Sequence, residues 1–388
     1  MSDDGATRAA VWLSAWDSQG IHRTATTGDE AGATWLLREA AGLGAAPATE
    51  GFALDRLDPI SAYFECDGER MPGVPVFDSP GTSADGITGI LTPIGGPVAG
   101  QGTIVVAELS PFNAYSPDYE QLRRDAACCG LLILCKGTQP GLGLLNAERF
   151  RSPYGAPAIH VASDARDAVF AAAARRTPAR LVAASRHTPA RARNTVVMIA
   201  GRDRARTPVV VMTPRSSWWQ STSERGGGLV CWLESLRALI ATPPLCDVIF
   251  TANSGHELGH LGLDEFMTRR PGWERPVAAG GAIWVHYGAN IGAVGGELSI
   301  QSASDDLRAL AAAELIRAGQ QPDQMAPKTL VPNGETRDIH RAGGCYVSLV
   351  GSNPLFHLPQ DRWPNAVDAG AVARIATGAS RLVVALTR

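Results

Sequence analysis

Residues 209–251 read VVVMTPRSSWWQSTSERGGGLVCWLESLRALIATPPLCDVIFT. Both ends of this stretch, 209–212 and 247–251, are apolar and rich in β-branched residues, which predicts two buried strands. Between them, the apolar residues of 228–240 recur at helical spacing, so a helix is expected there. Two strands joined by a helix are typical of a parallel pair within one sheet.

The same alternation of strand and helix continues toward the end of the chain. Further strands are predicted at 196–200, 281–285 and 346–350, and further helices at 258–269, 304–318 and 366–376. Helices that alternate with strands cover both faces of a mostly parallel sheet. The predicted fold class is therefore α/β, with a mostly parallel sheet covered by helices.

Residues 67–189 have a different character. Short β-branched runs broken by Gly and Pro, such as 86–92 and 102–108, predict a small β-rich unit. We therefore predict two domains, an α/β domain made of 1–66 and 190–388 and an inserted β-rich domain between them. The strands of the insert are expected to form a sheet of their own.

Composition limits the classes of function. The chain has 388 residues, of which 45% are hydrophobic and 19% charged, with a formal net charge of −3. This near-neutral balance argues against nucleic acid as a partner. The N-terminus lacks the basic start and apolar run of a signal peptide, and no apolar stretch approaches the roughly 20 residues that cross a bilayer.

The seven cysteines are scattered and form no C-x-x-C pair. This pattern predicts neither a disulfide framework nor a thiolate zinc site, and it favours a reducing compartment. We therefore expect a cytoplasmic protein that binds a small-molecule substrate and neither nucleic acid nor a membrane. The sequence leaves a homo-oligomer open.

Three stretches carry a family resemblance: ARNT at 192–195, VVVMTPRSSW at 209–218 and SGHELGHLG at 254–262. In sequence and order they resemble motifs of the zinc aminopeptidase superfamily, which includes glutamate carboxypeptidases and glutaminyl cyclases. The resemblance covers nearly the whole chain. It implies the family's α/β catalytic domain, and residues from about 70 to 185 resemble the protease-associated insert of many members.

The resemblance also locates the family's two-zinc site, where most ligands are replaced. Pro214 occupies the position of the family's first zinc-binding His, Ser223 that of the bridging carboxylate and Thr336 that of the last His. Glu257 keeps the position of a zinc-ligand Glu, and His286 stands at the fourth ligand, normally Asp. Because a zinc site needs about three ligands from His, Glu, Asp or Cys, we predict a degenerate site without stoichiometric metal.

Other positions around that site also differ from the family pattern. Ser216 replaces the Asp that orients the first His, and His256 replaces the general-base Glu. Glu224 is next to the bridging-carboxylate position, whereas His357 and Asp361 keep the family residues. Most of these groups are polar or ionisable, and burying them without a use would be costly, so the pattern favours a working site.

His256 is the candidate general base, because a neutral imidazole accepts a proton near pH 7 without a metal. Glu257 or Glu224 is expected to support it, and His286 is the next candidate. A serine nucleophile is a weaker hypothesis, since no G-x-S-x-G elbow is present. The predicted substrate-binding residues are Ser216, Ser217, Trp218, Arg225, Tyr287 and His357.

The residues leave alternatives open. Glu224, Glu257 and His286 are a possible single-zinc site. Residues 256–260 spell H-E-x-x-H, but a zincin needs this motif on one continuous helix, and here it follows a predicted strand. The main prediction is a metal-independent hydrolase that acts on an amide-type bond of a small polar molecule. The alternatives are a mono-zinc hydrolase, a proton-transfer lyase or isomerase, and a non-catalytic binding protein.

Overall fold

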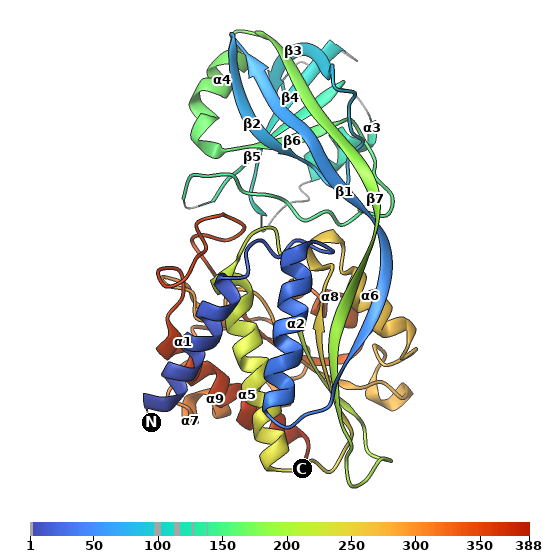
Figure 1. Ribbon diagram of the computed structural model, residues 1–388, viewed down its shortest axis with the longest axis vertical. Helices are drawn as coiled ribbons and strands as arrows, with labels where there is room; N and C mark the ends of the chain where they lie inside the picture. The colour runs from blue at the N-terminus through green and yellow to red at the C-terminus, as the bar shows by residue number, and fades with distance from the viewer. Residues whose placement is uncertain (1–2, 97–101, 112–116, 126–127, 138) are drawn as a thin grey trace.

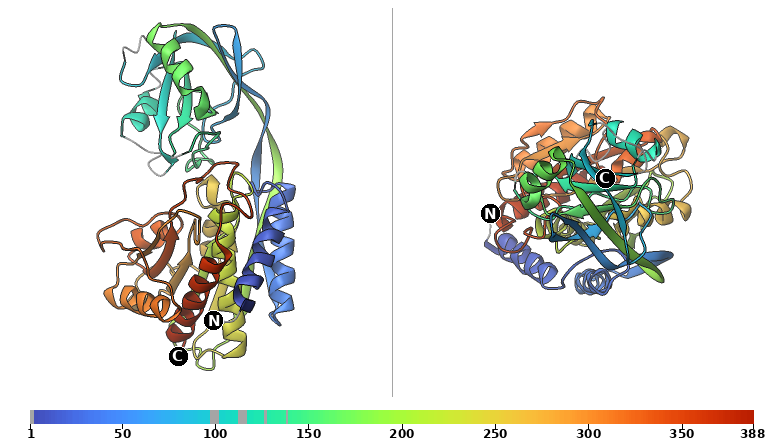
Figure 2. Two further views of the ribbon diagram at one scale, coloured as in Figure 1. Left: turned by 90° about the vertical axis from the view of Figure 1, so that its left-hand side faces the viewer. Right: turned by 90° about the horizontal axis from the view of Figure 1, so that it is seen from above.

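The computed structural model describes residues 3–96, 102–111, 117–125, 128–137 and 139–388. Two bodies lie along its longest axis and are joined by a two-stranded ribbon (Figure 1 and Figure 2). The ribbon consists of β1 (Pro47–Cys66) and β7 (Pro178–Ile199), which pair antiparallel over nearly their whole length.

The lower body in Figure 1 is built on a sheet whose central strands are parallel. After β7, the order across this sheet is β9 (Val248–Asn253), β8 (Val209–Pro214), β10 (Ile283–Tyr287), β13 (Cys345–Gly351), β11 (Leu298–Gln301) and β12 (Gln324–Met325). The antiparallel β7 and β11 flank the four parallel strands. Most residues of these four strands are buried and many are β-branched, which is why the sequence predicts them well.

Helices cover both faces of this sheet. The larger core contains residues of α1 (Asp3–Asp17), α2 (Thr27–Gly42), α5 (Gly227–Ala241), α7 (Asp305–Arg317) and α9 (Ala369–Leu386), whereas the smaller core on the other face contains residues of α6 (Leu261–Thr268) and α8 (Thr336–Arg341). Strand side chains alternate between the two, so that Val211 joins the larger core and Met212 the smaller one. The predicted α/β class, with a large central sheet covered by helices, is confirmed.

The upper body is rich in short strands, as predicted. It contains β2 (Glu69–Pro75), β3 (Ile87–Pro93), β4 (Thr103–Leu109), β5 (Gly130–Cys135) and β6 (Ala158–Val161), with α3 (Pro117–Asp125) and α4 (Arg166–Ala174). Two buried apolar clusters, one on each face of these strands, are separate from the cores of the lower body.

The expectation that the insert forms a sheet of its own is wrong. β7 pairs with β3 near its start and with β9 near its end. The described strands therefore form one 13-stranded sheet that runs through both bodies. The predicted boundary at 189/190 also lies inside β7. The cause is the length of the ribbon, because a single strand of 22 residues is long enough to belong to both bodies.

Among the described residues, only α9 is long and apolar enough to cross a membrane, by length and composition alone. The sequence analysis found no such stretch. One side of α9, including Val372, Ile375 and Leu382, lies in the larger core of the lower body. This burial is typical of a core helix in a folded domain.

Candidate functional site

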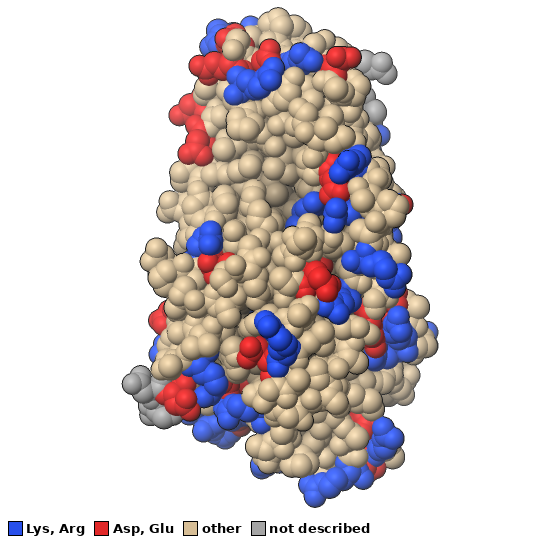
Figure 3. All heavy atoms as spheres, in the orientation of Figure 1, with Lys and Arg blue, Asp and Glu red and all other residues tan. Residues whose placement is uncertain are grey.

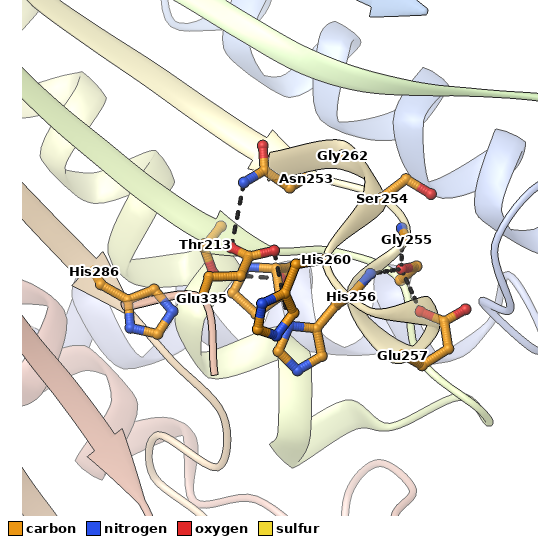
Figure 4. A network of polar contacts seen from close by, with 12 residues as sticks. Thr213, Asn253, Ser254, Gly255, His256, Glu257, His260, Gly262, His286 and Glu335 are labelled. Carbon is orange, nitrogen blue, oxygen red and sulfur yellow. Dashed lines mark hydrogen bonds and ion pairs between the residues drawn. The ribbon is translucent and has the colours of Figure 1, made fainter. Parts of the chain in front are cut away.

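The candidate site lies where the parallel strands end, at the edge where ligands bind in such sheets. After β9, the chain makes a tight turn at His256–Leu258 before α6 begins. Gly255 permits this turn because its φ of 83° is a left-handed conformation that glycine adopts without strain. The turn places His256 and Glu257 on different sides of the loop (Figure 4).

The H-E-x-x-H stretch does not form a continuous helix. The helix predicted at 258–269 begins only at Leu261, since Gly259 and His260 both have positive φ values. The zincin interpretation is therefore excluded. The two imidazoles of the stretch nevertheless lie side by side, with the ring centroids of His256 and His260 5.0 Å apart.

Three imidazoles line one cavity between the two bodies. The cavity has a volume of about 150 Å³, and His256, His260 and His286 form part of its wall. Gly334 lies between two of these rings, because a Cβ atom there would be 3.5 Å from His256 Cε1 and 3.7 Å from His286 Cε1. The other polar residues of the wall are Asn146, Glu148, Asn290, Asn333 and Arg337.

A carboxylate that the sequence analysis missed faces His256. Glu335 precedes α8, is fully buried, and its Oε1 lies 3.7 Å from His256 Nδ1. Neither atom has a hydrogen-bond partner within the described residues, while Glu335 Oε2 accepts a hydrogen bond from Asn253. Burial raises the pKa of Glu335 to about 7. Burial, followed by the charge of Arg225, lowers the pKa of His256 well below its usual value, so His256 is neutral.

His260 has the opposite character. Its Nδ1 lies 2.6 Å from Asp338 Oδ2, and this pair is also new relative to the sequence analysis. Burial alone would lower the pKa of His260, but the hydrogen bond and charge of Asp338 outweigh burial and raise it. The same contact outweighs burial to lower the pKa of Asp338. His260 is therefore the imidazole of this cavity that carries a proton most readily.

His286 is held by hydroxyl groups. Its Nδ1 is 2.8 Å from Ser348 Oγ and 3.3 Å from Thr336 Oγ1, while its buried Nε2 has no partner within the described residues. Burial, followed by nearby positive charges, lowers the pKa of His286 to about 3. His286 thus lines the cavity as a neutral ring whose Nδ1 faces hydroxyl groups, whereas the Nδ1 of His256 faces a carboxylate that can stabilise an added proton.

The predicted partner of His256, Glu257, does not contact its imidazole. Glu257 Oε1 accepts hydrogen bonds from the Thr24 amide and hydroxyl, at 2.7 and 2.6 Å, and its Oε2 accepts one from Ser216 Oγ at 2.6 Å. Ser216 Oγ in turn accepts hydrogen bonds from the backbone amides of Gly255 and His256. Glu257 and Ser216 therefore fix the backbone of the turn. The prediction that Glu257 orients the His256 side chain is wrong, because the carboxylate that faces His256 belongs to Glu335.

Glu224 does not contact His256 either and instead pairs with Arg225. Glu224 Oε1 lies 2.7 Å from Arg225 Nη2 and 3.5 Å from His357 Nε2, and all three side chains are buried. Burial would raise the pKa of Glu224, but the adjacent guanidinium dominates and brings it to about 2. Arg225 Nε donates to Ser216 O at 2.8 Å, which connects this cluster to the turn that carries His256.

Three predicted substrate-binding residues lie away from the cavity. Ser217 Oγ donates to Trp219 O, and Trp218 packs on Phe77 and donates to Asn146 Oδ1. Tyr287 belongs to the larger core of the lower body and hydrogen-bonds Ser235. Tyr287 follows His286 on β10, and alternation along a strand points neighbouring side chains to opposite faces. Of the ten predicted site residues, only His256 and His286 line the cavity.

Glu224, Glu257 and His286, the three candidate ligands of a single zinc, do not converge on one point. Glu257 is bound by Thr24 and Ser216, Glu224 by Arg225, and His286 Nδ1 by hydroxyl groups, so these three side chains do not converge. Within the described part of the chain, no group of three or more His, Cys, Asp or Glu residues is arranged to hold a metal. The single-zinc alternative is therefore not supported by the geometry.

No protein-family model and no curated protein matches this sequence. Solved structures match it over almost its full length. A zinc aminopeptidase from Bacillus subtilis has a TM-score of 0.76 at 16% identity, with 96% of this chain and 93% of that one covered. A peptidase M28 precursor from Shewanella amazonensis SB2B has a TM-score of 0.75 at 14% identity, with 100% and 96% covered. An aminopeptidase from Aneurinibacillus sp. strain AM-1 has a TM-score of 0.70 at 13% identity, with 97% and 93% covered. The chain therefore has the fold of the zinc aminopeptidases.

Proposed function

We propose that this chain is a hydrolase that works without a metal and cleaves an amide-type bond of a small polar molecule in the cavity. The observation that carries the proposal is the pair formed by His256, on the cavity wall, and the buried Glu335 that faces its Nδ1. Both facing atoms are buried and lack a hydrogen-bond partner among the described residues. Buried polar atoms are usually satisfied, and a catalytic role is one explanation for two that face each other without a partner.

The pair is suited to activate water. When Glu335 is ionised, its Oε1 can accept a hydrogen bond from the Nδ1–H of His256, which leaves His256 Nε2 as the basic nitrogen. A water molecule in the cavity would give its proton to Nε2 as its oxygen attacks the carbonyl carbon. His256 and Glu335 are 3.7 Å apart, so this hydrogen bond must shorten when substrate binds, as catalytic contacts often do.

His260 supplies the complementary acid. The pKa of His260 is raised, whereas the pKa of the neighbouring His256 is lowered. His260 is therefore suited to donate a proton and His256 to accept one. As the C–N bond breaks, a proton from His260 would neutralise the departing nitrogen. When the products leave, His256 releases to solvent the proton it took from water and His260 takes one up, so both imidazoles return to their starting states.

The cavity walls favour a small polar substrate. Its volume of about 150 Å³ is below the usual range for drug-sized ligands, which begins at about 300 Å³. Asn146, Asn290 and Asn333 offer amide groups that can pair with a carbonyl, hydroxyl or amide on the substrate.

The test is turnover of a panel of small amides and dipeptides by wild type and His256→Gln, in H₂¹⁸O and after treatment with chelator. We expect wild type to place one ¹⁸O in the acid product with and without chelator, and His256→Gln to lose roughly 100-fold or more in kcat. Deuterium exchange or elimination without ¹⁸O uptake would favour a lyase or isomerase. Loss of turnover with chelator would overturn the metal-free mechanism, and binding without turnover would favour a binding protein.

The remaining expectations stay proposals. We propose that the upper body is a protease-associated type of insert, supported by its short strands and its separate apolar clusters. A cytoplasmic location is supported by seven free cysteines, five of which are buried. The lack of a nucleic-acid or membrane partner is supported by the mixture of both charge signs on the face shown in Figure 3. Whether the chain forms a homo-oligomer is open.

A further inference from the structure

Asn290 is a buried residue of the cavity wall to which the proposed mechanism gives no role. It lies in the loop after β10, and only 2% of its surface is exposed. Its Nδ2 donates a hydrogen bond to Gly351 O at 3.3 Å. Because a carbonyl only accepts hydrogen bonds, this contact fixes which end of the amide faces Gly351. The other end, Oδ1, is buried and has no hydrogen-bond partner within the described residues.

The other buried asparagines in the described part of the chain use both ends of their amide groups. Asn194 Nδ2 donates to Gly262 O at 2.8 Å, and its Oδ1 accepts from Ser254 N at 3.1 Å. Asn253 and Asn353 likewise both donate and accept. Leaving a buried acceptor unpaired is costly, so the exception on the cavity wall indicates a place where a ligand supplies the missing donor.

His286 has a second unsatisfied atom on the same wall. Its Nδ1 is held by Ser348 of β13, just as Asn290 is held by Gly351 at the end of that strand. Burial keeps the ring neutral by lowering its pKa to about 3, and its buried Nε2 has no partner within the described residues. In a neutral imidazole, Nε2 accepts or donates a hydrogen bond according to the tautomer. The end of β13 therefore anchors one side of each residue and leaves the other side for a ligand.

A ligand that matches both atoms needs an N–H donor for Asn290 and a group of either kind for His286. A carboxamide offers both, since its nitrogen donates and its carbonyl oxygen accepts. We propose that Asn290 and His286 recognise an uncharged carboxamide with at least one N–H, and that Asn290 Oδ1 is the acceptor that determines specificity. Esters and tertiary amides lack this N–H and are rejected, because they leave the buried oxygen unpaired.

The charges of the wall argue against an amine as the ligand. Asn290 and His286 carry no charge. Glu148, the acidic side chain among the described wall residues, forms an ion pair with Arg337. His260, whose pKa is raised, adds positive charge to the wall. A buried ammonium group would therefore lack a counter-charge, which is costly, whereas a neutral amide needs none.

The link from this site to the reaction rests on the proposed function. A Cβ atom at Gly334 would lie 3.7 Å from His286 Cε1 and 3.5 Å from His256 Cε1, so both rings, which Figure 4 shows, border one point. A carboxamide held by His286 therefore lies next to the proposed base, and the recognised amide is also the bond that is cleaved. The substrate class is then primary or secondary amides that need no free amino group.

The test measures binding of small probes to the full chain by ligand-observed NMR. We expect acetamide and N-methylacetamide to bind at least about tenfold more tightly than N,N-dimethylacetamide and methyl acetate, which cannot pair the buried acceptor. Methylammonium should bind as weakly as the last two, because it adds an uncompensated charge. Equal binding of acetamide and N,N-dimethylacetamide, or no binding of acetamide, would overturn the proposal.

Two substitutions of Asn290 test the acceptor itself. Asn290→Gly removes it without straining the backbone, because glycine readily adopts the φ of 65° found at this position. This variant should bind acetamide about tenfold more weakly and no longer distinguish it from N,N-dimethylacetamide. Asn290→Asp supplies a charged acceptor and should bind methylammonium at least about tenfold more tightly than wild type does. Unchanged acetamide affinity in the first variant, or no methylammonium gain in the second, would refute the assignment.

Asn194→Asp is the matched control. Asn194 is buried and donates to a glycine carbonyl as Asn290 does, but its Oδ1 is already bonded to Ser254 N, and it lies outside the described wall of the cavity. We expect no gain of methylammonium binding by Asn194→Asp. An equal gain in both aspartate variants would contradict a site at Asn290.

These binding measurements need no turnover, so the two proposals can fail separately. If acetamide binds as expected and no amide is hydrolysed, the hydrolase assignment is wrong and the carboxamide site stands. If esters and N,N-dimethyl amides are hydrolysed with the same kcat/KM as amides that carry an N–H, the carboxamide site is wrong and the hydrolase assignment stands.

Discussion

Replacing Glu335 with Gln tests the central pair directly. Gln has the shape of Glu, but when its carbonyl oxygen keeps the hydrogen bond from Asn253, its NH2 group faces His256 Nδ1 and cannot accept the Nδ1–H hydrogen bond. We expect kcat to fall by roughly 100-fold or more, the usual contribution of a positioned base. In wild type, kcat/KM should rise about tenfold per pH unit up to about pH 7, where Glu335 ionises, and then level off. The variant should lack this acidic limb.

The same substitution has a stability signature of defined sign. The folded pKa of Glu335 is about 7, above its ordinary value of 4.5. The folded state therefore binds the proton more tightly, so stability is full below pH 4.5 and is lost as pH rises toward 7. At 1.36 kcal/mol per pKa unit, the loss is of order 3 kcal/mol, and Glu335→Gln should abolish this part of the pH dependence.

The assays are kcat/KM profiles from pH 5 to 9 and urea unfolding at both ends of that range. Glu257→Gln is the matched control, since Glu257 is as buried as Glu335 but its carboxylate hydrogen-bonds Thr24 and Ser216 instead of facing His256. It should keep the acidic limb. If Glu335→Gln retains the limb and turns over within about threefold of wild type, the assignment of Glu335 is wrong and the base must be His256 alone.

Three further substitutions separate the roles of the buried groups. Asp338→Asn should lower the pKa of His260, and kcat/KM should fall earlier on the alkaline side; an unchanged profile would remove His260 as the acid. Glu257→Ala should lower the free energy of unfolding in urea by about 3 kcal/mol, because the buried donors of Thr24 and Ser216 lose their acceptor. A loss below about 1 kcal/mol would contradict the anchoring role. Tyr287→Phe should cost about 1 kcal/mol through its bond to Ser235 and leave kcat unchanged, whereas a drop in kcat would return Tyr287 to the site.

The fold follows from the sequence because its signals are periodic and local. The buried strand at 209–212 and the helix at 228–240 are confirmed as β8 and α5 within two or three residues. The helix predicted at 258–269 starts late because the left-handed φ of His260 is set by the turn and not by helical spacing. The length of β7 was also missed, since a strand that bends from one body into another has no break in its pattern.

The site was only partly predictable. His256 and His286 follow or end parallel strands, and strand ends converge in such a sheet. Glu335 belongs to a stretch without strand or helix periodicity, and its side chain reaches His256 only because the chain returns across the sheet edge before α8. Asp338 was equally hidden. The sequence did contain a signal for Glu335, because it is the acidic residue next to Thr336, which the resemblance places at a zinc-ligand position.

The substitutions at the family's zinc positions make sense as coupled pairs. Thr336, which the resemblance places at a zinc-ligand position, contacts His286, and Ser216, which it places at an orienting position, donates to Glu257. Arg225 compensates Glu224. Each ionisable side chain that remains has thus gained a protein partner that holds it without a cation. For that reason, we expect that Pro214→His would leave the other groups already bonded and would not create a zinc site.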